Sequence, residues 1–194
     1  MSGPGDAPNS DSAPTPAPDP DPAPDPEEAD RHRRRVLWAL PTGLYLIGSR
    51  HGDEVNLMTA NLVVQVCVEP KLVGVALEHE SVTARLVTAG GGFSISLLAR
   101  ADRDVVRRFV KPVNDVERAP DGAVLALSGR FVTEVGPRRV PVLASAAGYL
   151  DCRLTRTEPL GSHVWCVGEV TGVGGEPAEA EVLRMEDTRM HYGG

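Results

Sequence analysis

The feature that most constrains this fold is a series of short β-rich segments that follow one another at the spacing of hairpins. Apolar and β-branched residues fill residues 43–49, 60–68 and 72–78, and short turns separate these runs. Continuous apolar runs of this kind are typical of strands that are buried on both faces. Parallel strands would need crossovers of about a dozen residues or more. The spacing therefore indicates antiparallel pairing.

The rest of the chain adds further strands and a few short helices. Residues 93–99 and 149–156 alternate apolar and polar side chains, which is the period of a strand with two unlike faces. Further strands are expected at 123–127, 130–135 and 163–173, and short helices at 34–40, 81–87 and 102–110. The predicted fold class is mainly β: a closed or nearly closed antiparallel barrel with a few short helices.

The first 30 residues differ from the rest in composition. They hold nine of the 17 prolines, six Asp and two Glu, and no Lys or Arg. The whole chain carries a net charge of −7, so residues 31–194 together carry about +1. Such a segment cannot bury enough apolar surface to offset its ordering entropy. We therefore expect a disordered, Pro- and Asp-rich acidic tail over residues 1–30, followed by one domain over residues 31–194.

Charge and hydropathy exclude two kinds of partner. A nearly neutral domain with 4% aromatic residues is not typical of a nucleic-acid-binding protein. No stretch approaches the ~18 apolar residues of a membrane span, and the N-terminus lacks the apolar core of a secretory signal. A cytoplasmic protein is expected. The basic run at residues 31–35 fits a solvated strip, a partner for the acidic tail, or a contact for the 2′-phosphate of NADPH.

Several motifs of catalysis and metal binding are missing. The sequence holds no GxGxxG after a strand, no GxxxxGK[ST], no GxSxG and no HExxH. The spacing of Cys67, Cys152 and Cys166 fits neither a zinc site nor a CxxC redox pair. No metal site is predicted. If the protein is an enzyme, a bound cofactor is expected to carry the chemistry.

Sequence motifs that follow one another along residues 36–175 resemble those of one known family. The run "NLMTANLVVQVCVEPKLVGVALEHESVT" (56–83) is similar to the ligand-binding core of the flavin reductase-like family. "GLYLIGSRHGDEVN" (43–56) resembles its first hairpin, and "GGFSISLLA" (91–99) and "GSHVWCVGEVTGV" (161–173) resemble later strands. Ser96, where many members carry Asn, and Lys71, where a second Pro is common, depart from the pattern.

This resemblance implies the fold and the activity. The expected fold is the FMN-binding split barrel, and the expected enzyme is an NAD(P)H:flavin oxidoreductase that transfers a hydride from NADH or NADPH to FMN. A homodimer is expected, with FMN near the subunit interface, and a partner monooxygenase could receive the reduced flavin. The alternative is an FMN-binding electron-transfer module that passes electrons to a protein partner.

The resemblance also implies which residues hold the flavin ring. Backbone N–H groups of Thr59, Ala60 and Asn61 would reach its pyrimidine edge, and Gln65 would bind ribityl or ring atoms. Burying Gln65 without a partner would cost free energy, which favours a ligand or an interface beside it. The expected ring-binding residues are Met58, Thr59, Ala60, Asn61, Gln65, Val66 and Cys67.

The phosphate and the nicotinamide have separate expected residues. Ser81 and Thr83 lie in the first turn of a predicted helix, where free N–H groups favour an anion, and His79 adds a candidate charge. Capping of the helix by Ser81 is the alternative. The resemblance implies that His163 faces the nicotinamide side of the flavin as the catalytic residue. Arg189 and Tyr192, near the C-terminus, are further candidates to cover the site or a dimer partner.

Overall fold

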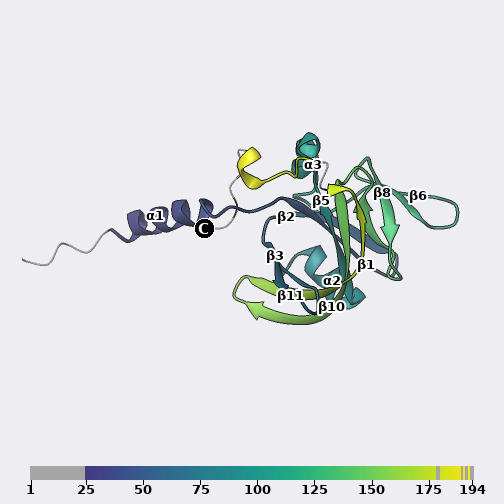
Figure 1. Cartoon of the computed structure of the whole chain (residues 1–194), viewed down its shortest axis with the longest axis horizontal. Helices are drawn as coiled ribbons and strands as arrows, with labels where there is room; N and C mark the ends of the chain where they lie inside the picture. Colours follow the sequence, from purple (N-terminus) through teal and green to yellow (C-terminus); the bar gives the residue numbers. More distant parts are fainter. Residues whose placement is uncertain (1–24, 178–179, 189, 191, 193–194) are drawn as a thin grey trace, which may run out of the picture.

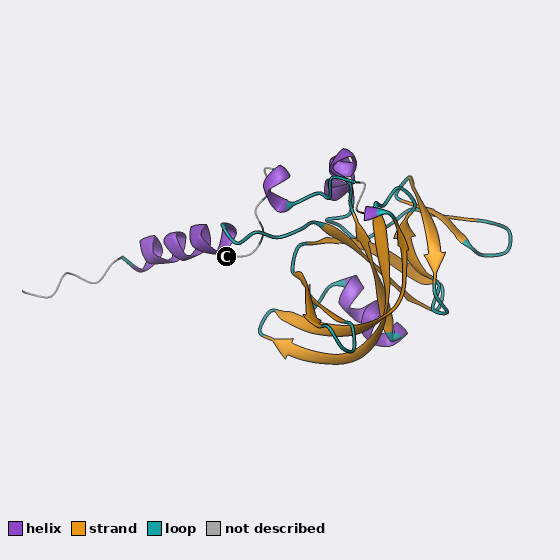
Figure 2. Ribbon diagram, in the orientation of Figure 1, coloured by secondary structure: helices purple, strands orange, loops and turns teal. Residues whose placement is uncertain are grey.

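The computed structural model describes residues 25–177, 180–188, 190 and 192. Its strands form two antiparallel sheets (Figures 1 and 2). The larger sheet has the strand order β2-β1-β5-β10-β11-β4-β3. Its strands are β1 (Tyr45–His51), β2 (Glu54–Ala60), β3 (Val63–Cys67), β4 (Leu72–Glu78), β5 (Gly92–Leu97), β10 (Gly148–Leu160) and β11 (His163–Gly175).

The chain itself explains why this sheet curls. Strands β2 and β3 lie at its opposite edges, yet only Asn61 and Leu62 separate them in the sequence. The two edges must therefore come close to each other at these residues. The backbone carbonyl of Leu62 also accepts a hydrogen bond of 3.0 Å from the Ala76 N–H, which ties this corner to β4. The mainly β, antiparallel split barrel expected from the sequence is confirmed.

The smaller sheet packs against β1 and β5 through a buried apolar cluster that includes Leu46 and Leu143, and two serine hydroxyls of β5 add hydrogen bonds to its backbone. Its four strands have the order β6-β7-β8-β9. The Ser94 hydroxyl donates to the Pro141 carbonyl at 2.6 Å, and the Ser96 hydroxyl accepts from the Leu143 N–H at 3.0 Å. Ser96 therefore fixes one sheet on the other. The strands are β6 (Val116–Arg118), β7 (Val124–Leu127), β8 (Arg130–Val135) and β9 (Val140–Leu143).

The helices are short. Helix α2 packs inside the curl of the larger sheet, where Ala84 and Val87 join a buried cluster with Val75 and Phe93. Gly91 ends it in a left-handed conformation, φ 69°, which glycine adopts without steric cost. The helices are α1 (Pro26–Trp38), α2 (Val82–Gly90) and α3 (Arg103–Arg108), with 3₁₀ turns at Arg100–Asp102 and Met185–Asp187. None of the helices that the structure describes is long and apolar enough to cross a membrane.

Helix α1 begins earlier than the sequence indicated, inside the segment expected to be the tail. Asp25 caps it by accepting from the Glu27 N–H at 3.2 Å, and Pro26 fits its first turn. Asp30 pairs with Arg34 one turn on, at 3.0 Å. Acidic residues that we took for a tail therefore form the start of a helix. Residues 1–24 lie outside the described residues.

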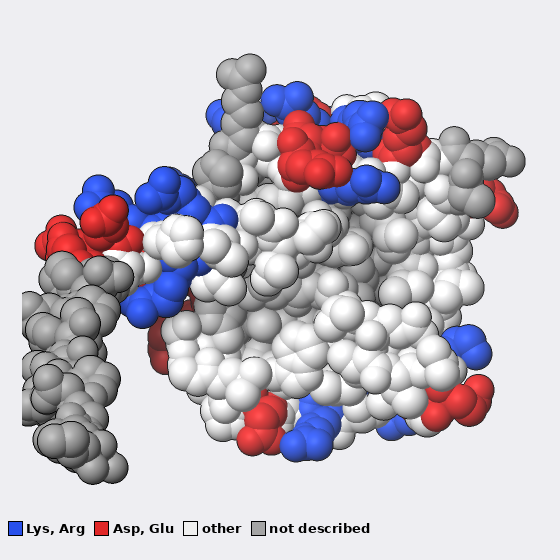
Figure 3. Space-filling view, turned by 60° about the vertical axis from the view of Figure 1, so that its left-hand side comes forward, with Lys and Arg blue, Asp and Glu red and all other residues white. Residues whose placement is uncertain are grey.

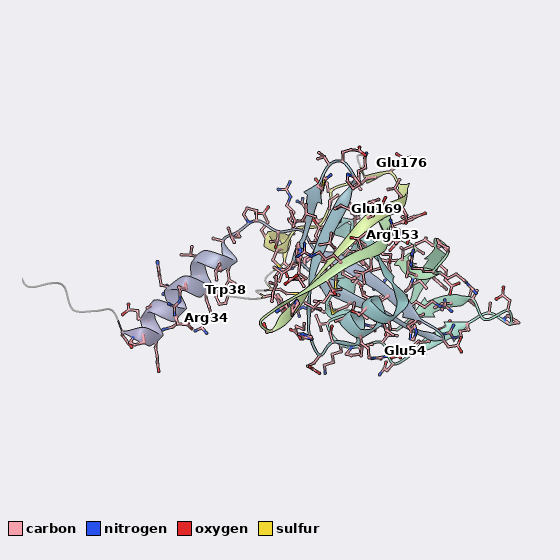
Figure 4. The ribbon with its side chains drawn as sticks, turned by 90° about the horizontal axis from the view of Figure 1, so that it is seen from below. Arg34, Trp38, Glu54, Arg153, Glu169 and Glu176 are labelled. Carbon is pink, nitrogen blue, oxygen red and sulfur yellow. The ribbon has the colours of Figure 1, made fainter. Side chains whose placement is uncertain are left out.

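This helix extends away from the barrel as an arm, as Figures 1 and 4 show. No side chain of α1 is buried against the described part of the chain. Arg34 and Trp38 both lie on the arm in Figure 4, whereas Arg153 and Glu169 form an ion pair across β10 and β11 on the barrel. The barrel therefore does not depend on α1 for its core.

Strand β3 differs from the expectation of burial on both faces. Val64 and Val66 are 53% and 44% exposed, whereas Val73 and Val75 of the neighbouring β4 are buried. The physical reason is position: β3 is an edge strand that pairs only with β4 among the strands of the sheet. The apolar run alone does not distinguish an edge strand from a central one.

Candidate functional site

One cavity lies where the two edges of the larger sheet meet, and we call it the edge cavity. Its volume is about 170 Å³. Its walls come from the end of β2, the turn into β3, the end of β4 and the C-terminal segment. It is lined by Leu44, Met58, Thr59, Ala60, Asn61, Leu62, Ala76, Glu78, Val110, Met185, Met190 and Tyr192. Four of the predicted ring-binding residues, 58–61, therefore share one cavity.

Hydrogen bonds to the C-terminal end of α3 hold this part of β2 in place. The Thr59 hydroxyl donates to the Val106 carbonyl at 2.7 Å, and the Thr59 N–H donates to the Phe109 carbonyl at 3.0 Å. The Thr59 N–H is thus already used inside the protein. That this N–H reaches a flavin ring stays a prediction, and no local pattern in the sequence indicates that residues 106–109 pack beside β2.

A chain of hydrogen bonds links the edge cavity to His163. The Tyr192 hydroxyl donates to Glu78 Oε1 at 2.7 Å and lies 3.1 Å from His163 Nε2. His163 Nδ1 lies 2.8 Å from the Ser162 hydroxyl. Glu78 and His163 are direct neighbours across β4 and β11. His163 does not line the cavity itself, and it reaches the cavity through Tyr192.

The environment of Tyr192 keeps its phenol protonated. Tyr192 is 44% exposed, and its partial burial, followed by the hydrogen bond to Glu78, raises the pKa of Tyr192 to about 12. At neutral pH the Tyr192 oxygen therefore keeps its hydrogen and donates it to the Glu78 carboxylate. Tyr192 also meets the His163 ring edge-on, with ring centroids 6.3 Å apart. The other C-terminal candidate, Arg189, lies outside the described residues.

The other predicted ring-binding residues lie away from the edge cavity. Gln65 lines a separate cavity of about 330 Å³, together with Val64 and Lys71. Its side-chain amide donates to the Cys67 carbonyl at 3.2 Å, and the Cys67 thiol donates to the Glu69 carbonyl at 3.3 Å. Val66 is exposed. A single chain therefore does not bring Gln65, Val66 and Cys67 to the cavity that residues 58–61 share.

The predicted phosphate residues differ in exposure. The Ser81 hydroxyl accepts from the Ala84 N–H at 3.1 Å and so caps α2, as the alternative reading stated. Thr83 is fully buried, and its hydroxyl accepts from the Asn56 amide at 2.9 Å. The Thr83 hydroxyl faces the core, so the structure does not present it to a phosphate. His79 is exposed at the surface.

A larger cavity adjoins the edge cavity, and we call it the outer cavity. It measures about 670 Å³ and lies between residues 38–45 and the C-terminal segment. Met185 and Met190 line both cavities and so form the wall between them. Methionine side chains are flexible and adapt to irregular space. The wall is therefore one that side-chain motion alone can move.

Sequence reasoning missed Asn56, Glu78, Met185 and Met190. Asn56 is 3% exposed, and its side-chain oxygen Oδ1 accepts a hydrogen bond from the Val113 N–H at 2.8 Å. Residues 55–57 of β2 are all buried, so no alternation of buried and exposed residues along this strand indicates the burial of Asn56. The positions of Glu78 and the two methionines depend on contacts far apart in the sequence, and no local pattern indicates them.

Comparison with known proteins shows the family of this chain. A family model described as "Flavin reductase like domain" matches residues 37–194. The chain belongs to this family. It is 28% identical over 142 residues to an NADH-dependent flavin reductase of Rhodococcus, covering 72% of this chain and 73% of that protein. It is also 30% identical over 140 residues to the high molecular weight rubredoxin of Moorella thermoacetica, covering 71% of this chain.

A solved structure supports the same family assignment. The NADH:FAD oxidoreductase SgcE6 of Streptomyces globisporus, in complex with NAD and FAD fragments, superposes with a TM-score of 0.68 at 25% identity. The match covers 88% of this chain and 95% of that chain. In contrast, the chain spans 57% of the length of the Moorella rubredoxin. Some flavin reductase-like relatives are therefore longer than this domain.

Proposed function

We propose that the protein is an NAD(P)H-dependent flavin reductase that acts on FMN. The observation that carries this proposal is the edge cavity, which brings residues 58–61 together with Glu78, Tyr192 and, through Tyr192, His163. The similarity to reductases named for NADH and for flavin, FMN or FAD supports it.

The residues of the edge cavity fit a flavin ring in chemical character. Met58, Ala60, Leu62 and Ala76 offer an apolar wall, and Asn61 offers an amide at the rim. Ligand pockets usually measure about 300–1,000 Å³, so the edge cavity alone is small for such a ring. Movement of the methionine wall into the outer cavity would supply the missing space.

The chain's own residues would bind, orient and shield. Flavin, when bound, supplies the hydride acceptor, so the reaction needs no acid or base from the protein. The apolar wall would exclude water, and Asn61 and Tyr192 would orient the ligand by hydrogen bonds. Ser81 and the first turn of α2 would hold the phosphate. The Tyr192 oxygen would keep its proton throughout.

Assembly and partners belong to the same proposal. We propose a homodimer, supported by the exposed valines 64, 66 and 68 on and beside β3. Figure 3 shows a broad face on which charged side chains gather at the edges. The separation of Gln65 from the edge cavity also fits a site that a second copy completes. A partner oxygenase is supported by the 29% identity to the reductase subunit Stc3 of a stachydrine N-demethylase from Rhizobium meliloti. A cytoplasmic location stays a prediction.

The second candidate is an FMN-binding electron-transfer module. The similarity to a protein named high molecular weight rubredoxin favours it. Purified protein mixed with FMN and NADH or NADPH separates the two candidates through the absorbance of the reduced nicotinamide. Fast oxidation that depends on FMN supports the reductase. Tight binding of FMN with negligible oxidation of the nicotinamide supports the electron-transfer module. A protein that binds no FMN refutes both candidate functions.

A further inference from the structure

The two hydrogen bonds of Tyr192 use its hydrogen and one of the two lone pairs on its oxygen. A phenol oxygen has one hydrogen to donate and two lone pairs that accept. A carboxylate can only accept, so the hydrogen goes to Glu78 Oε1, 2.7 Å away. His163 Nε2, at 3.1 Å, must then be the donor of its own bond to Tyr192. One lone pair of the Tyr192 oxygen remains.

The same logic fixes the proton on His163. A neutral imidazole carries its hydrogen on one nitrogen and accepts at the other. With the hydrogen on Nε2, Nδ1 accepts from the Ser162 hydroxyl, 2.8 Å away. Ser162 and Tyr192 therefore hold the ring from both sides. His163 contacts Tyr192 in this arrangement and does not line the edge cavity itself.

The charge of the cavity wall indicates what the open lone pair can bind. Among the described residues that line the edge cavity there is no Lys, Arg or His, and Glu78 is the one ionisable carboxyl group. The described part of the wall therefore carries the negative charge of Glu78 and no positive charge, which favours a neutral N–H donor over a phosphate. The phosphate candidate Ser81 lies outside this lining, which is consistent with a phosphate that binds away from the edge cavity.

We propose that Tyr192 recognises a neutral ring-borne N–H group of the ligand through its remaining lone pair. The inference rests on the proposed function, which supplies two ligands with such a group. One is the carboxamide NH₂ of a nicotinamide dinucleotide, and the other is the imide N3–H of FMN. The Glu78 and His163 hydrogen bonds hold the acceptor in place before the ligand arrives.

A comparison of ligand analogues with Tyr192→Phe tests this recognition. Phenylalanine keeps the ring and removes the oxygen. The reduced 3-acetylpyridine analogue of NADH lacks the carboxamide NH₂, and N3-methyl-FMN lacks the imide hydrogen. We expect Tyr192→Phe to lower kcat/KM for NADH, or the affinity for FMN, by about three- to tenfold. The analogue of the ligand that Tyr192 binds should show the same kcat/KM or affinity in Tyr192→Phe as in the wild type, because this analogue cannot make the hydrogen bond. The pair that shows this coupling identifies the ligand.

Tyr149→Phe is the matched control, because Tyr149 lies outside the lining of the edge cavity. Tyr149→Phe should change neither kcat/KM for NADH nor the affinity for FMN, and it should leave both values unchanged for the analogues. The proposal would be overturned if Tyr192→Phe weakened each natural ligand and its analogue equally, both for NADH and for FMN. A wild-type protein that neither binds FMN nor oxidises NADH would overturn the proposed function and this ligand assignment together.

The hydrogen-bond arrangement has its own test in the ligand-free protein. Nitrogen NMR of histidine-labelled protein at mildly alkaline pH reports which ring nitrogen carries hydrogen, and His163→Gln identifies the His163 signals. We expect Nε2–H in the wild type and a mixture of both tautomers in Ser162→Ala with Tyr192→Phe. Hydrogen on Nδ1 in the wild type would overturn the arrangement, whatever the flavin experiments give.

Discussion

Replacing Thr83 by valine separates a structural role from a ligand-binding role for this residue. Thr83 is fully buried, and Asn56, which donates to it at 2.9 Å, is 3% exposed. Valine has almost the same shape, so the variant leaves no cavity, but the Asn56 amide loses this partner. A buried polar group left without its partner costs about 1–3 kcal/mol. We expect Thr83→Val to lower the free energy of unfolding by about 2 kcal/mol.

Urea unfolding of the ligand-free protein measures this change. With a denaturant dependence of about 1–3 kcal/mol per M, the unfolding midpoint should fall by roughly 1 M. Thr88→Val is the matched control, because Thr88 is exposed on the same helix. An exposed substitution of this kind should change the free energy of unfolding by about 0.5 kcal/mol or less.

Titration with FMN completes the test. Thr83→Val should leave the FMN affinity of the folded protein unchanged, whereas Ser81→Ala should weaken it by about 1.5–3 kcal/mol if the Ser81 hydroxyl binds the phosphate. The reasoning would be refuted by Thr83→Val protein with an unchanged unfolding midpoint and a weakened FMN affinity. That result would assign the Thr83 hydroxyl to the phosphate.

Three further predictions concern pH, the N-terminal segment and assembly. Burial raises the pKa of the Cys152 thiol from 9.0 to about 12, and the neighbouring Asp151 carboxylate adds to this shift. Burial alone raises the pKa of the Cys166 thiol from 9.0 to about 11. The folded protein keeps these protons while the unfolded chain loses them above pH 9, so stability should fall by up to about 1.4 kcal/mol per pH unit for each thiol. Urea unfolding above pH 9 should show this fall in stability with pH in Cys67→Ala and a shallower fall in Cys152→Ala. A stability that does not change with pH above 9 would contradict the burial argument. Deleting residues 1–30 should leave the thermal transition and FMN binding in place, and loss of the transition would show that the segment supports the fold. Val66→Lys should convert a dimer into a monomer in light scattering, whereas a monomeric wild type would rule out the homodimer.

The fold was largely predictable because strand and helix patterns are local. Strand β4 has the predicted bounds 72–78, and β8 has the predicted bounds 130–135. The start of α1 was missed because acidic residues suit both a tail and a first helical turn. The exposure of β3 was missed because its apolar run says nothing about its place at the sheet edge.

The candidate site was predictable in part, for the same reason. Residues 58–61 are consecutive on one strand and its turn, so they share a cavity as a local motif would. Tyr192 reaches Glu78 from the other end of the chain, and that approach depends on how the C-terminal segment packs. Thr83 was assigned to the phosphate because its core-facing position on α2 cannot be read from the "SVT" motif alone.

The most direct test of the central claim is the affinity of the edge cavity for FMN. Ala76 lines the cavity and is partly buried, so Ala76→Phe would fill the space proposed for the flavin ring. FMN fluorescence titration should show an affinity at least about tenfold weaker than in the wild type, at a similar melting temperature. Ala89→Phe, at an exposed position of α2, should bind FMN as the wild type does. Undiminished FMN affinity in folded Ala76→Phe would contradict the assignment of the flavin to this cavity.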